Sequence, residues 1–254
     1  MSHVSIVTGA SRGIGKAIAE ILLQSAPTTK IVVIARTEPP LKALEEKYGS
    51  DRVGVVTGDI TDALVSKKAV DLAVSKFGQL NSIIANAGVL EPVGTIDSTS
   101  VDDWKRLYDI NLFSIVELIK QSLPHLKKTT GRVIAVSSGA ATKAYSGWYA
   151  YGSSKAALNH LILSLATDEK DIRAISIAPG VVDTEMQNDI RGKHGKNMSP
   201  EGLQRFIDLH KNKQLVAPEE PGTVYAKLAL NGWSDDLNGK FLRYNDEVLK
   251  DYQL

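Results

Sequence analysis

Residues 4–15 read Val-Ser-Ile-Val-Thr-Gly-Ala-Ser-Arg-Gly-Ile-Gly, a β-branched run that passes directly into three closely spaced glycines. A helical pattern follows over residues 13–24, with apolar residues recurring at helical spacing. A strand that turns through glycines into a helix N-terminus leaves unpaired N–H groups and the positive end of the helix dipole, and it lets a phosphate approach the backbone closely. The stretch therefore predicts a phosphate-binding loop, although a glycine turn without a ligand remains the alternative. A Walker A loop is excluded because Lys16 is followed by Ala17 and not by Ser or Thr.

The rest of the chain continues the alternation of strand and helix. Short β-branched runs alternate with longer helical patterns to about residue 180, which is typical of a parallel sheet covered by helices. We expect strands at residues 4–8, 31–35, 53–57, 82–85, 132–137 and 174–178, and a late strand near 240–244. Ser100 with Asp103, and Ser199 with Pro200, predict two helix starts. The fold class is thus α/β, doubly wound in three layers, with a seven-stranded, mainly parallel sheet.

Length and composition exclude several classes of function. The chain has 254 residues, 43% of them hydrophobic, and a formal net charge of +1. Near-zero charge gives no field for nucleic acid or an anionic membrane, and the absence of cysteine excludes disulfides, thiolate nucleophiles and Cys-ligated metals. The five histidines show no metal-ligand spacing, so no metal site is expected. No linker divides the sequence, and neither a signal peptide nor a long apolar span is visible, so we expect a single domain over residues 1–254 and a cytoplasmic location.

The end of the second predicted strand bears on which dinucleotide would bind. About twenty residues after Gly15, an acidic residue would bind the ribose 2′-hydroxyl of NAD, whereas a cation would accept the 2′-phosphate of NADP. Arg36 occupies that position, and Arg12 lies inside the glycine turn. Two guanidinium groups that converge on one phosphate favour NADP(H). Glu38 is the alternative, because a carboxylate there would favour NAD.

A second group of residues follows the fifth predicted strand. Ser138 comes just after that strand. Tyr151 and Lys155 are four residues apart at the start of a helical pattern, so these two share one helix face. A neighbouring ammonium is expected to lower the pKa of the tyrosine, which would then act as a general acid to a carbonyl oxygen, while Ser138 would hydrogen-bond the same oxygen. Taken alone, a Tyr-x-x-x-Lys pair is more often a solvated surface pair.

In combination, these motifs resemble the short-chain dehydrogenase/reductase family. Residues 8–15 are similar to its Thr-Gly-x-x-x-Gly-x-Gly loop, and Ser138 stands thirteen residues before Tyr151, as in the family. The family's ordered motifs extend over nearly the whole chain. The other matching segments are Asp59-Ile60, Asn86-Ala87-Gly88, Asn111, and Pro179-Gly180 followed by Val182 and Thr184.

The resemblance implies a Rossmann fold and hydride transfer between the nicotinamide and a carbonyl carbon, with Tyr151 as acid and base. Lys155 would also bind the nicotinamide ribose, and Asn111 would hold a water in a proton relay. The implied catalytic residues are Ser138, Tyr151, Lys155 and Asn111. The implied cofactor-binding residues are Gly9, Ser11, Arg12, Gly13, Ile14, Gly15, Arg36, Asp59, Ile60, Asn86, Ala87, Gly88, Tyr151, Lys155, Pro179, Gly180, Val182 and Thr184.

The substrate region is expected to come from the last third of the chain. Trp148, Tyr149, Met186 and Ile190 are candidates for an aromatic and apolar pocket, against the alternative that the two aromatic residues pack on a neighbouring helix. Residues 185–215 are candidates for a substrate lid, because residues 185–197 show weak periodicity and two glycines; a solvated loop is the other reading. Within the family, the chain is most similar to the sepiapterin and benzil reductase group, which implies a small-molecule ketone or dicarbonyl substrate.

The tail bears on assembly. The Asp-Gly-Gly ending common in the family is absent from residues 238–244, which favours a homodimer through the helices carrying Asn111 and Tyr151 over a tetramer. The main functional alternative is a non-catalytic NADP(H)-binding sensor or regulatory protein, which would have no need of an acid/base pair. A nucleotide-sugar epimerase is less favoured, because such proteins usually carry a different glycine spacing and a longer substrate region.

Overall fold

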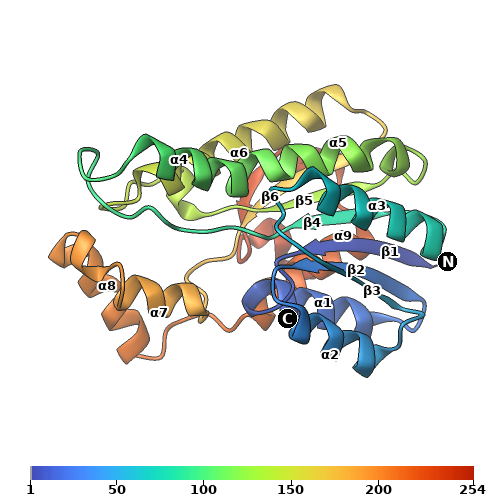
Figure 1. Cartoon of the computed structure of the whole chain (residues 1–254), viewed down its shortest axis with the longest axis horizontal. Coiled ribbons are helices and arrows are strands. Elements are labelled where there is room, and N and C mark those ends of the chain that lie inside the picture. The colour runs from blue at the N-terminus through green and yellow to red at the C-terminus, as the bar shows by residue number, and fades with distance from the viewer. Residues whose placement is uncertain (1) are drawn as a thin grey trace.

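The computed structural model describes residues 2–254 and has a twisted sheet between two layers of helices (Figure 1). All seven strands pair in parallel, in the order β3-β2-β1-β4-β5-β6-β7. This confirms the predicted doubly wound fold, and the sheet is parallel throughout rather than mainly so. The elements are β1 (His3–Thr8), α1 (Gly13–Ser25), β2 (Thr29–Ala35), α2 (Glu38–Tyr48), β3 (Val53–Thr57), α3 (Ala63–Phe77), β4 (Ser82–Ala85), α4 (Val101–Tyr108), α5 (Ser114–Lys127), β5 (Arg132–Val136), α6 (Tyr149–Asp168), β6 (Arg173–Ala178), α7 (Glu185–Arg191), α8 (Pro200–Lys211), α9 (Glu219–Asn231) and β7 (Phe241–Arg243).

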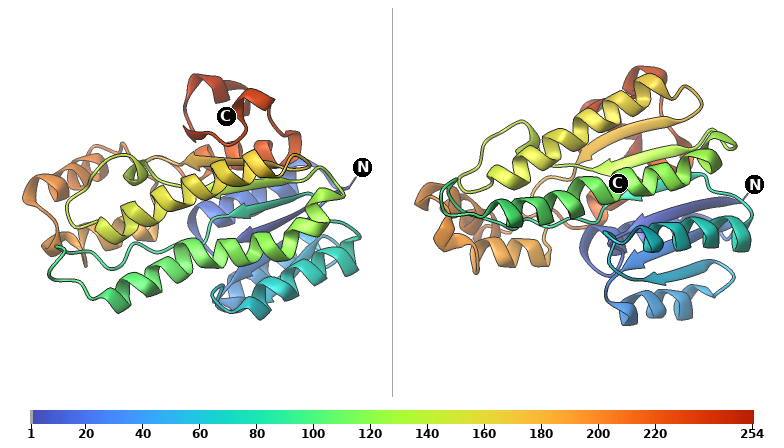
Figure 2. Two further views of the ribbon diagram at one scale, coloured as in Figure 1. Left: turned by 90° about the horizontal axis from the view of Figure 1, so that it is seen from above. Right: turned by 45° about the horizontal axis from the view of Figure 1, so that its top comes forward.

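Alternation along the strands produces a core on each face of the sheet. Val7 and Val33 pack with α1, α2 and α9 on one face, whereas Ile6 and Val32 pack with α3, α5 and α6 on the other. These strands are buried on both faces, so they read in the sequence as continuous apolar runs. Figure 1 shows α4, α5 and α6 above the sheet and α1 and α2 below it, and the left view of Figure 2 looks onto the α5 and α6 layer with the sheet behind it.

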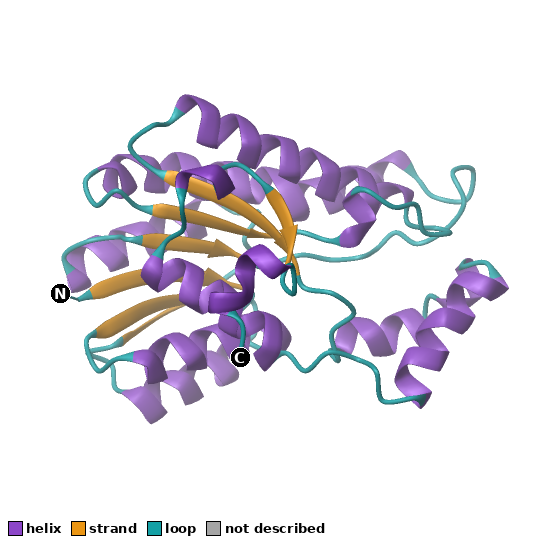
Figure 3. Cartoon of the chain, turned by 180° about the vertical axis from the view of Figure 1, so that it is seen from behind, coloured by secondary structure: helices purple, strands orange, loops and turns teal. Residues whose placement is uncertain are grey.

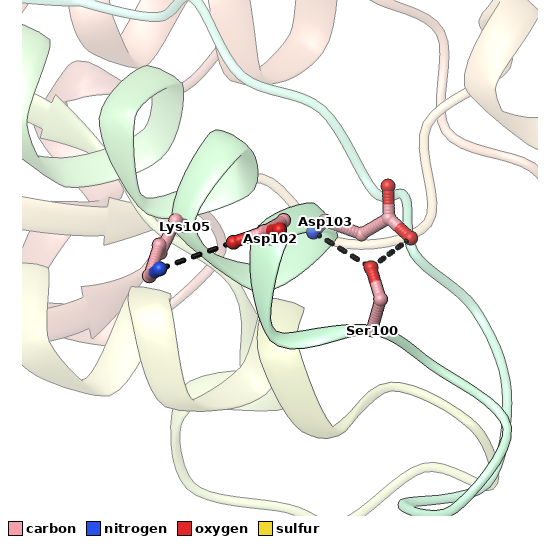
Figure 4. A network of polar contacts seen from close by, with 4 residues as sticks. All are labelled: Ser100, Asp102, Asp103 and Lys105. Atoms are coloured by element: carbon pink, nitrogen blue, oxygen red, sulfur yellow. Dashed lines mark hydrogen bonds and ion pairs between the residues drawn. The ribbon is translucent and has the colours of Figure 1, made fainter.

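Two of the helix starts predicted from the sequence are present. The Ser100 hydroxyl accepts a hydrogen bond from the Asp103 N–H at 3.1 Å and donates one to the Asp103 carboxylate at 2.7 Å, which caps α4 (Figure 4). Ser199 caps α8 in the same way by accepting from the Gly202 N–H, with Pro200 at the first helical position.

The sheet has its switch point between β1 and β4, where consecutive crossovers leave in opposite directions. In doubly wound folds ligands bind outside the carboxyl ends of the strands at this point. Helices α7 and α8 project beyond the same ends (Figures 1 and 3). Part of the weakly periodic segment 185–197 is helical in the structure. This helix, α7, has seven residues and is too short to show a clear period in the sequence.

Candidate active site

A cavity of about 750 Å³ opens at the carboxyl ends of the strands. Its walls come from the loops after β1 to β6, from the first turns of α1 and α6, and from α7 and α8. The cavity is lined by the following predicted site residues: Gly9, Ser11, Arg12, Gly13, Ile14, Arg36, Asp59, Ile60, Asn86, Ala87, Gly88, Ser138, Trp148, Tyr151, Lys155, Pro179, Gly180, Val182, Thr184, Met186 and Ile190. Residues spread over most of the sequence are thus brought to one site.

The glycine loop forms the part of the cavity wall that would face a pyrophosphate. Gly9 and Gly13 have φ of +67° and +54°, a left-handed conformation that favours glycine, and a Cβ on Gly13 would lie 3.1 Å from Cγ2 of Thr184. Helix α1 has no side-chain cap and no acidic residue in its first turn. Its N–H groups and dipole are therefore free of a competing carboxylate, which fits the phosphates of a dinucleotide.

The neighbouring wall carries two cations. Arg12 and Arg36 both line the cavity, and among residues 2–254 neither has a carboxylate within ion-pair distance. Asp59 lies on the same wall, and its pKa is held below its ordinary value by hydrogen bonds from Thr61 and by the charges of Arg36 and Arg106. This end of the cavity combines an ionised carboxylate with guanidinium groups, which suits a phosphorylated ribose and its base.

Hydrogen bonds tie the loops after β1 and β4 together at the switch point. The Thr8 hydroxyl accepts from the backbone N–H groups of Asn86 and Ala87, both at 2.9 Å. The Asn86 side chain donates to the carbonyl oxygens of Thr8 and Gly9, at 2.9 and 3.3 Å. These bonds fix the glycine loop relative to the floor of the cavity.

Tyr151 and Lys155 lie one turn apart at the start of α6, and both side chains are buried. Lys155 Nζ donates a hydrogen bond to the carbonyl oxygen of Val136 at 2.9 Å and lies 5.9 Å from the centre of the Tyr151 ring. Ser138 is the second residue after β5 and lines the same cavity. The three side chains therefore surround one small volume, as their spacing predicted.

Burial moves the pKa values of the two α6 residues in opposite directions. Burial raises the pKa of Tyr151, an effect that Ser138 opposes, and burial lowers the pKa of Lys155 to about 8. The sequence predicts that the neighbouring Lys155 lowers the pKa of Tyr151, but burial raises it instead, and the opposing effect comes from Ser138. At neutral pH Tyr151 is protonated, which is the form a proton donor requires.

Asn111 lies outside the cavity lining. It is fully buried in a π-helical turn over Asp109–Phe113. Its side chain accepts from the N–H of Val89 and donates to the carbonyl oxygen of the same residue, both at 2.8 Å, and also donates to the Ser154 hydroxyl at 3.3 Å. Asn111 therefore holds the segment after Gly88 against the first turns of α6, the helix that carries Tyr151.

Two further predicted residues also lie outside the lining. A Cβ on Gly15 would collide with the carbonyl oxygen of Gly9 and with the Asn86 amide, so this glycine permits close packing behind the loop. Tyr149 is 51% exposed and points away from the cavity wall that its neighbour Trp148 helps to form.

Aromatic side chains form the end of the cavity nearest α8. Trp148 stacks on Tyr145 and Phe206, with ring centres 4.9 and 5.5 Å apart, and meets the Tyr151 ring edge-on at 5.6 Å. Tyr145, Arg205 and Phe206 also line the cavity and were missed from the sequence. The helix start at Ser199-Pro200 was the available signal, since it places Phe206 on the buried face of α8.

Metal-ligand clusters and membrane-spanning helices are both absent from the described residues. Over residues 2–254, no cluster of three or more His, Asp or Glu side chains is arranged to hold a metal ion. None of the helices in this range combines the length and apolar character needed to cross a bilayer.

Comparison with known proteins agrees with the geometry. A family model described as short chain dehydrogenase matches residues 3–195. The chain is 45% identical over 258 residues to a benzil reductase ((S)-benzoin forming) of Saccharomyces cerevisiae, covering 98% of each chain. Two solved structures from the same yeast, a short chain dehydrogenase/reductase and a cytoplasmic protein with unknown function, are each 50% identical with full coverage of both chains, at TM-scores of 0.98 and 0.86. These findings confirm the resemblance: the chain belongs to the short chain dehydrogenase family of nicotinamide-dependent oxidoreductases.

Proposed function

We propose that this oxidoreductase reduces a ketone or 1,2-dicarbonyl to an alcohol and uses NADPH. The observation that carries the proposal is the convergence of Ser138, Tyr151 and Lys155 on one cavity beside the glycine loop. A protein that only senses the cofactor has no need of a buried acid/base pair next to an aromatic pocket.

The chain's own residues supply the proton and the positioning. Ser138 holds the substrate oxygen, and Tyr151 donates a proton to it. Lys155 is anchored by the Val136 carbonyl and would bind the nicotinamide ribose beside Tyr151. Bound NADPH supplies the hydride. Asn111 does not line the cavity and acts by holding the Val89 segment and Ser154 in place. A water held near Asn111 would extend the path of the proton from Tyr151.

NADP(H) is favoured over NAD(H) by the charges around the ribose end of the cavity. Arg12 and Arg36 line that end, while Glu38, the residue that would favour NAD, is exposed at the start of α2 and does not line it. A 2′-phosphate would meet two guanidinium groups there, with bidentate hydrogen bonds available from each.

The substrate is proposed to bind against Trp148, Met186 and Ile190, under a lid formed by residues 185–215. The benzil reductase name of the yeast relative supports an aromatic dicarbonyl. We also propose that residues 1–254, of which residue 1 lies outside the described part, act as one domain, and that the protein is cytoplasmic, as the yeast neighbour of 50% identity is described.

The proposed assembly is a homodimer through the helices that carry Asn111 and Tyr151. Large apolar side chains remain exposed on this side of the molecule, namely Phe113 before α5 and Leu163 on α6. Helices α5 and α6 run side by side there in both views of Figure 2. Burial of this face against a second copy would remove the exposed apolar surface from water.

The test is direct. Purified protein is mixed with benzil and either NADPH or NADH, and the loss of reduced-nicotinamide absorbance is followed. We expect turnover with NADPH and a lower kcat/KM with NADH. Arg36→Asp is expected to move the preference toward NADH, because a hydroxyl acceptor replaces a phosphate-binding cation. An unchanged preference would mean that Arg36 is not the selector. Persistent inactivity over a broad carbonyl panel, together with tight NADPH binding, would favour the sensor alternative.

A further inference from the structure

The substrate end of the cavity is apolar and aromatic apart from a few polar groups, and one of these is a cation. Arg205 lies on α8 and lines the cavity next to Tyr145 and Phe206. Its guanidinium carbon is 5.5 Å from the centre of the Tyr145 ring and 6.0 Å from that of Phe206. The two rings therefore restrict where this long side chain can go, at a site where the substrate body is proposed to lie.

Arg205 has most of its hydrogen-bonding capacity free. Within residues 2–254 its only hydrogen bond from the guanidinium is a long one, from Nη1 to the Tyr145 hydroxyl at 3.4 Å. Asp59 and Glu185 are the carboxylates that line the cavity, and neither pairs with Arg205, nor does any other carboxylate in this range. A guanidinium fork oriented by aromatic faces and lacking an acidic partner is suited to bind a carboxylate with two parallel hydrogen bonds.

A row of aromatic rings connects Arg205 to Tyr151. Tyr151 meets Trp148 edge-on, Trp148 stacks on Tyr145 and Phe206, and Arg205 lies over both of these outer rings. A substrate whose carbonyl lies at Tyr151 and whose ring lies along Trp148 would extend toward Arg205 at its far end.

We infer that Arg205 is a specificity residue that selects aryl ketones or aryl dicarbonyls bearing a carboxylate remote from the reacting carbonyl. This inference rests on the proposed function, since it assumes that carbonyl reduction takes place at Tyr151. Beyond the proposed function, it states that a preferred substrate differs from benzil by carrying a remote carboxylate.

The test uses a matched pair of ketones, benzil carrying a 4-carboxylate and the methyl ester of the same compound. The wild-type protein is expected to have a kcat/KM for the acid about tenfold or more above that for the ester. Arg205→Gln should abolish that preference and leave the kcat/KM for the ester within about twofold. Arg205→Lys should keep part of the preference, because a point charge remains but the fork is lost. Raised salt should reduce the preference of the wild type, since the cation is exposed to solvent.

Lys211→Gln on the same helix is the matched control, because it removes a cation that does not line the cavity. Parallel loss of activity on acid and ester in Arg205→Gln would mean that Arg205 only holds α8 against Tyr145, and it would overturn the inference. Equal use of acid and ester by the wild type would overturn it as well. Failure of the wild type to reduce either ketone with NADPH or NADH would instead count against the proposed function.

Discussion

Tyr151 is a buried phenol with a raised pKa, so it holds its proton at neutral pH. Tyr151→Phe keeps the ring that meets Trp148 edge-on and removes only the hydroxyl. We expect turnover to fall by about 10²-fold or more, because proton donation contributes about that much, while NADPH binding stays intact. Steady-state kinetics and a cofactor titration check the two halves of this prediction. Turnover equal to that of the wild type would exclude Tyr151 as the proton donor.

Lys155 is a buried cation whose pKa is lowered by desolvation from 10.5 to about 8. In the unfolded chain the group keeps its ordinary pKa, so between pH 8 and 10.5 the unfolded state binds more protons and stability rises with pH. Below pH 8 both states are protonated and the full desolvation penalty remains. Lys155→Met is therefore expected to abolish reduction and yet raise the free energy of unfolding at pH 7 by about 1–3 kcal/mol.

Urea unfolding at pH 7 and pH 9.5 measures this effect. The gain from Lys155→Met should shrink at the higher pH, because the wild type no longer holds a full buried charge there. Lys170→Met, which replaces an exposed lysine, is the control and should change neither value. A destabilised Lys155→Met protein at both pH values would show that the bond to the Val136 carbonyl outweighs the desolvation of the ammonium.

At this scale the sequence located most of the site, because ordered motifs at fixed spacing name residues independently of the loops between them. It did not predict the contacts of Asn111, whose side chain is bonded to the Val89 backbone from a π-helical turn. It also grouped Tyr149 with Trp148, although neighbouring residues at a helix start point in different directions.

Among the elements, α7 and α8 are joined by a segment that contacts two loops of the rest of the molecule. Lys193 forms an ion pair with Glu91 in the loop after β4, and His194 Nε2 lies 3.4 Å from the same carboxylate. Asn197 donates to the carbonyl oxygen of Val93 at 3.0 Å, and the Ser199 N–H donates to the Ser146 hydroxyl at 2.9 Å. These contacts hold residues 193–199 of the proposed lid against the loop after β4 and the loop before α6, and together they are called the latch.

Glu91→Gln is expected to loosen this latch. Since an exposed ion pair contributes only up to about 1 kcal/mol, hydrogen exchange in residues 193–199 should quicken by about two- to fivefold while the rest of the chain is unaffected. Exchange followed by mass spectrometry measures this locally. Asp71→Asn breaks the exposed Lys67–Asp71 pair on α3 and is the matched control. Unchanged exchange in residues 193–199 would show that the latch does not hold the lid.

All seven strands were predicted within two residues at their N-terminal ends, because buried parallel strands are uninterrupted β-branched runs. The lid was harder to predict, since α7 has only seven residues and the hydrogen bonds of the segment after it reach residues 53 and 104 positions away in sequence. Such pairings leave no periodic signal.

At the scale of the whole molecule, the exposed face of α5 and α6 is the proposed dimer interface. A double variant, Phe113→Glu with Leu163→Glu, is expected to convert the proposed dimer to a monomer, because burying two carboxylates in an interface is strongly unfavourable. Light scattering after gel filtration measures the mass. Val248→Glu, in the short helical segment Glu247–Tyr252 that packs on the opposite face of the sheet, replaces a side chain of similar exposure and should leave the dimer intact. A wild-type protein that is monomeric at assay concentration would refute the homodimer.

The stack around Trp148 also has an optical consequence. The chain has three tryptophans, and Trp148 is the one that lines the cavity. Its indole meets the Tyr151 ring edge-on and stacks on Phe206 of α8, so a ligand that fills the pocket changes the surroundings of this fluorophore. Fluorescence emission from Trp148 would therefore report occupancy of the cavity and movement of the proposed lid without an added label. Replacing Trp104 and Trp233 by Phe would leave Trp148 as the single tryptophan signal.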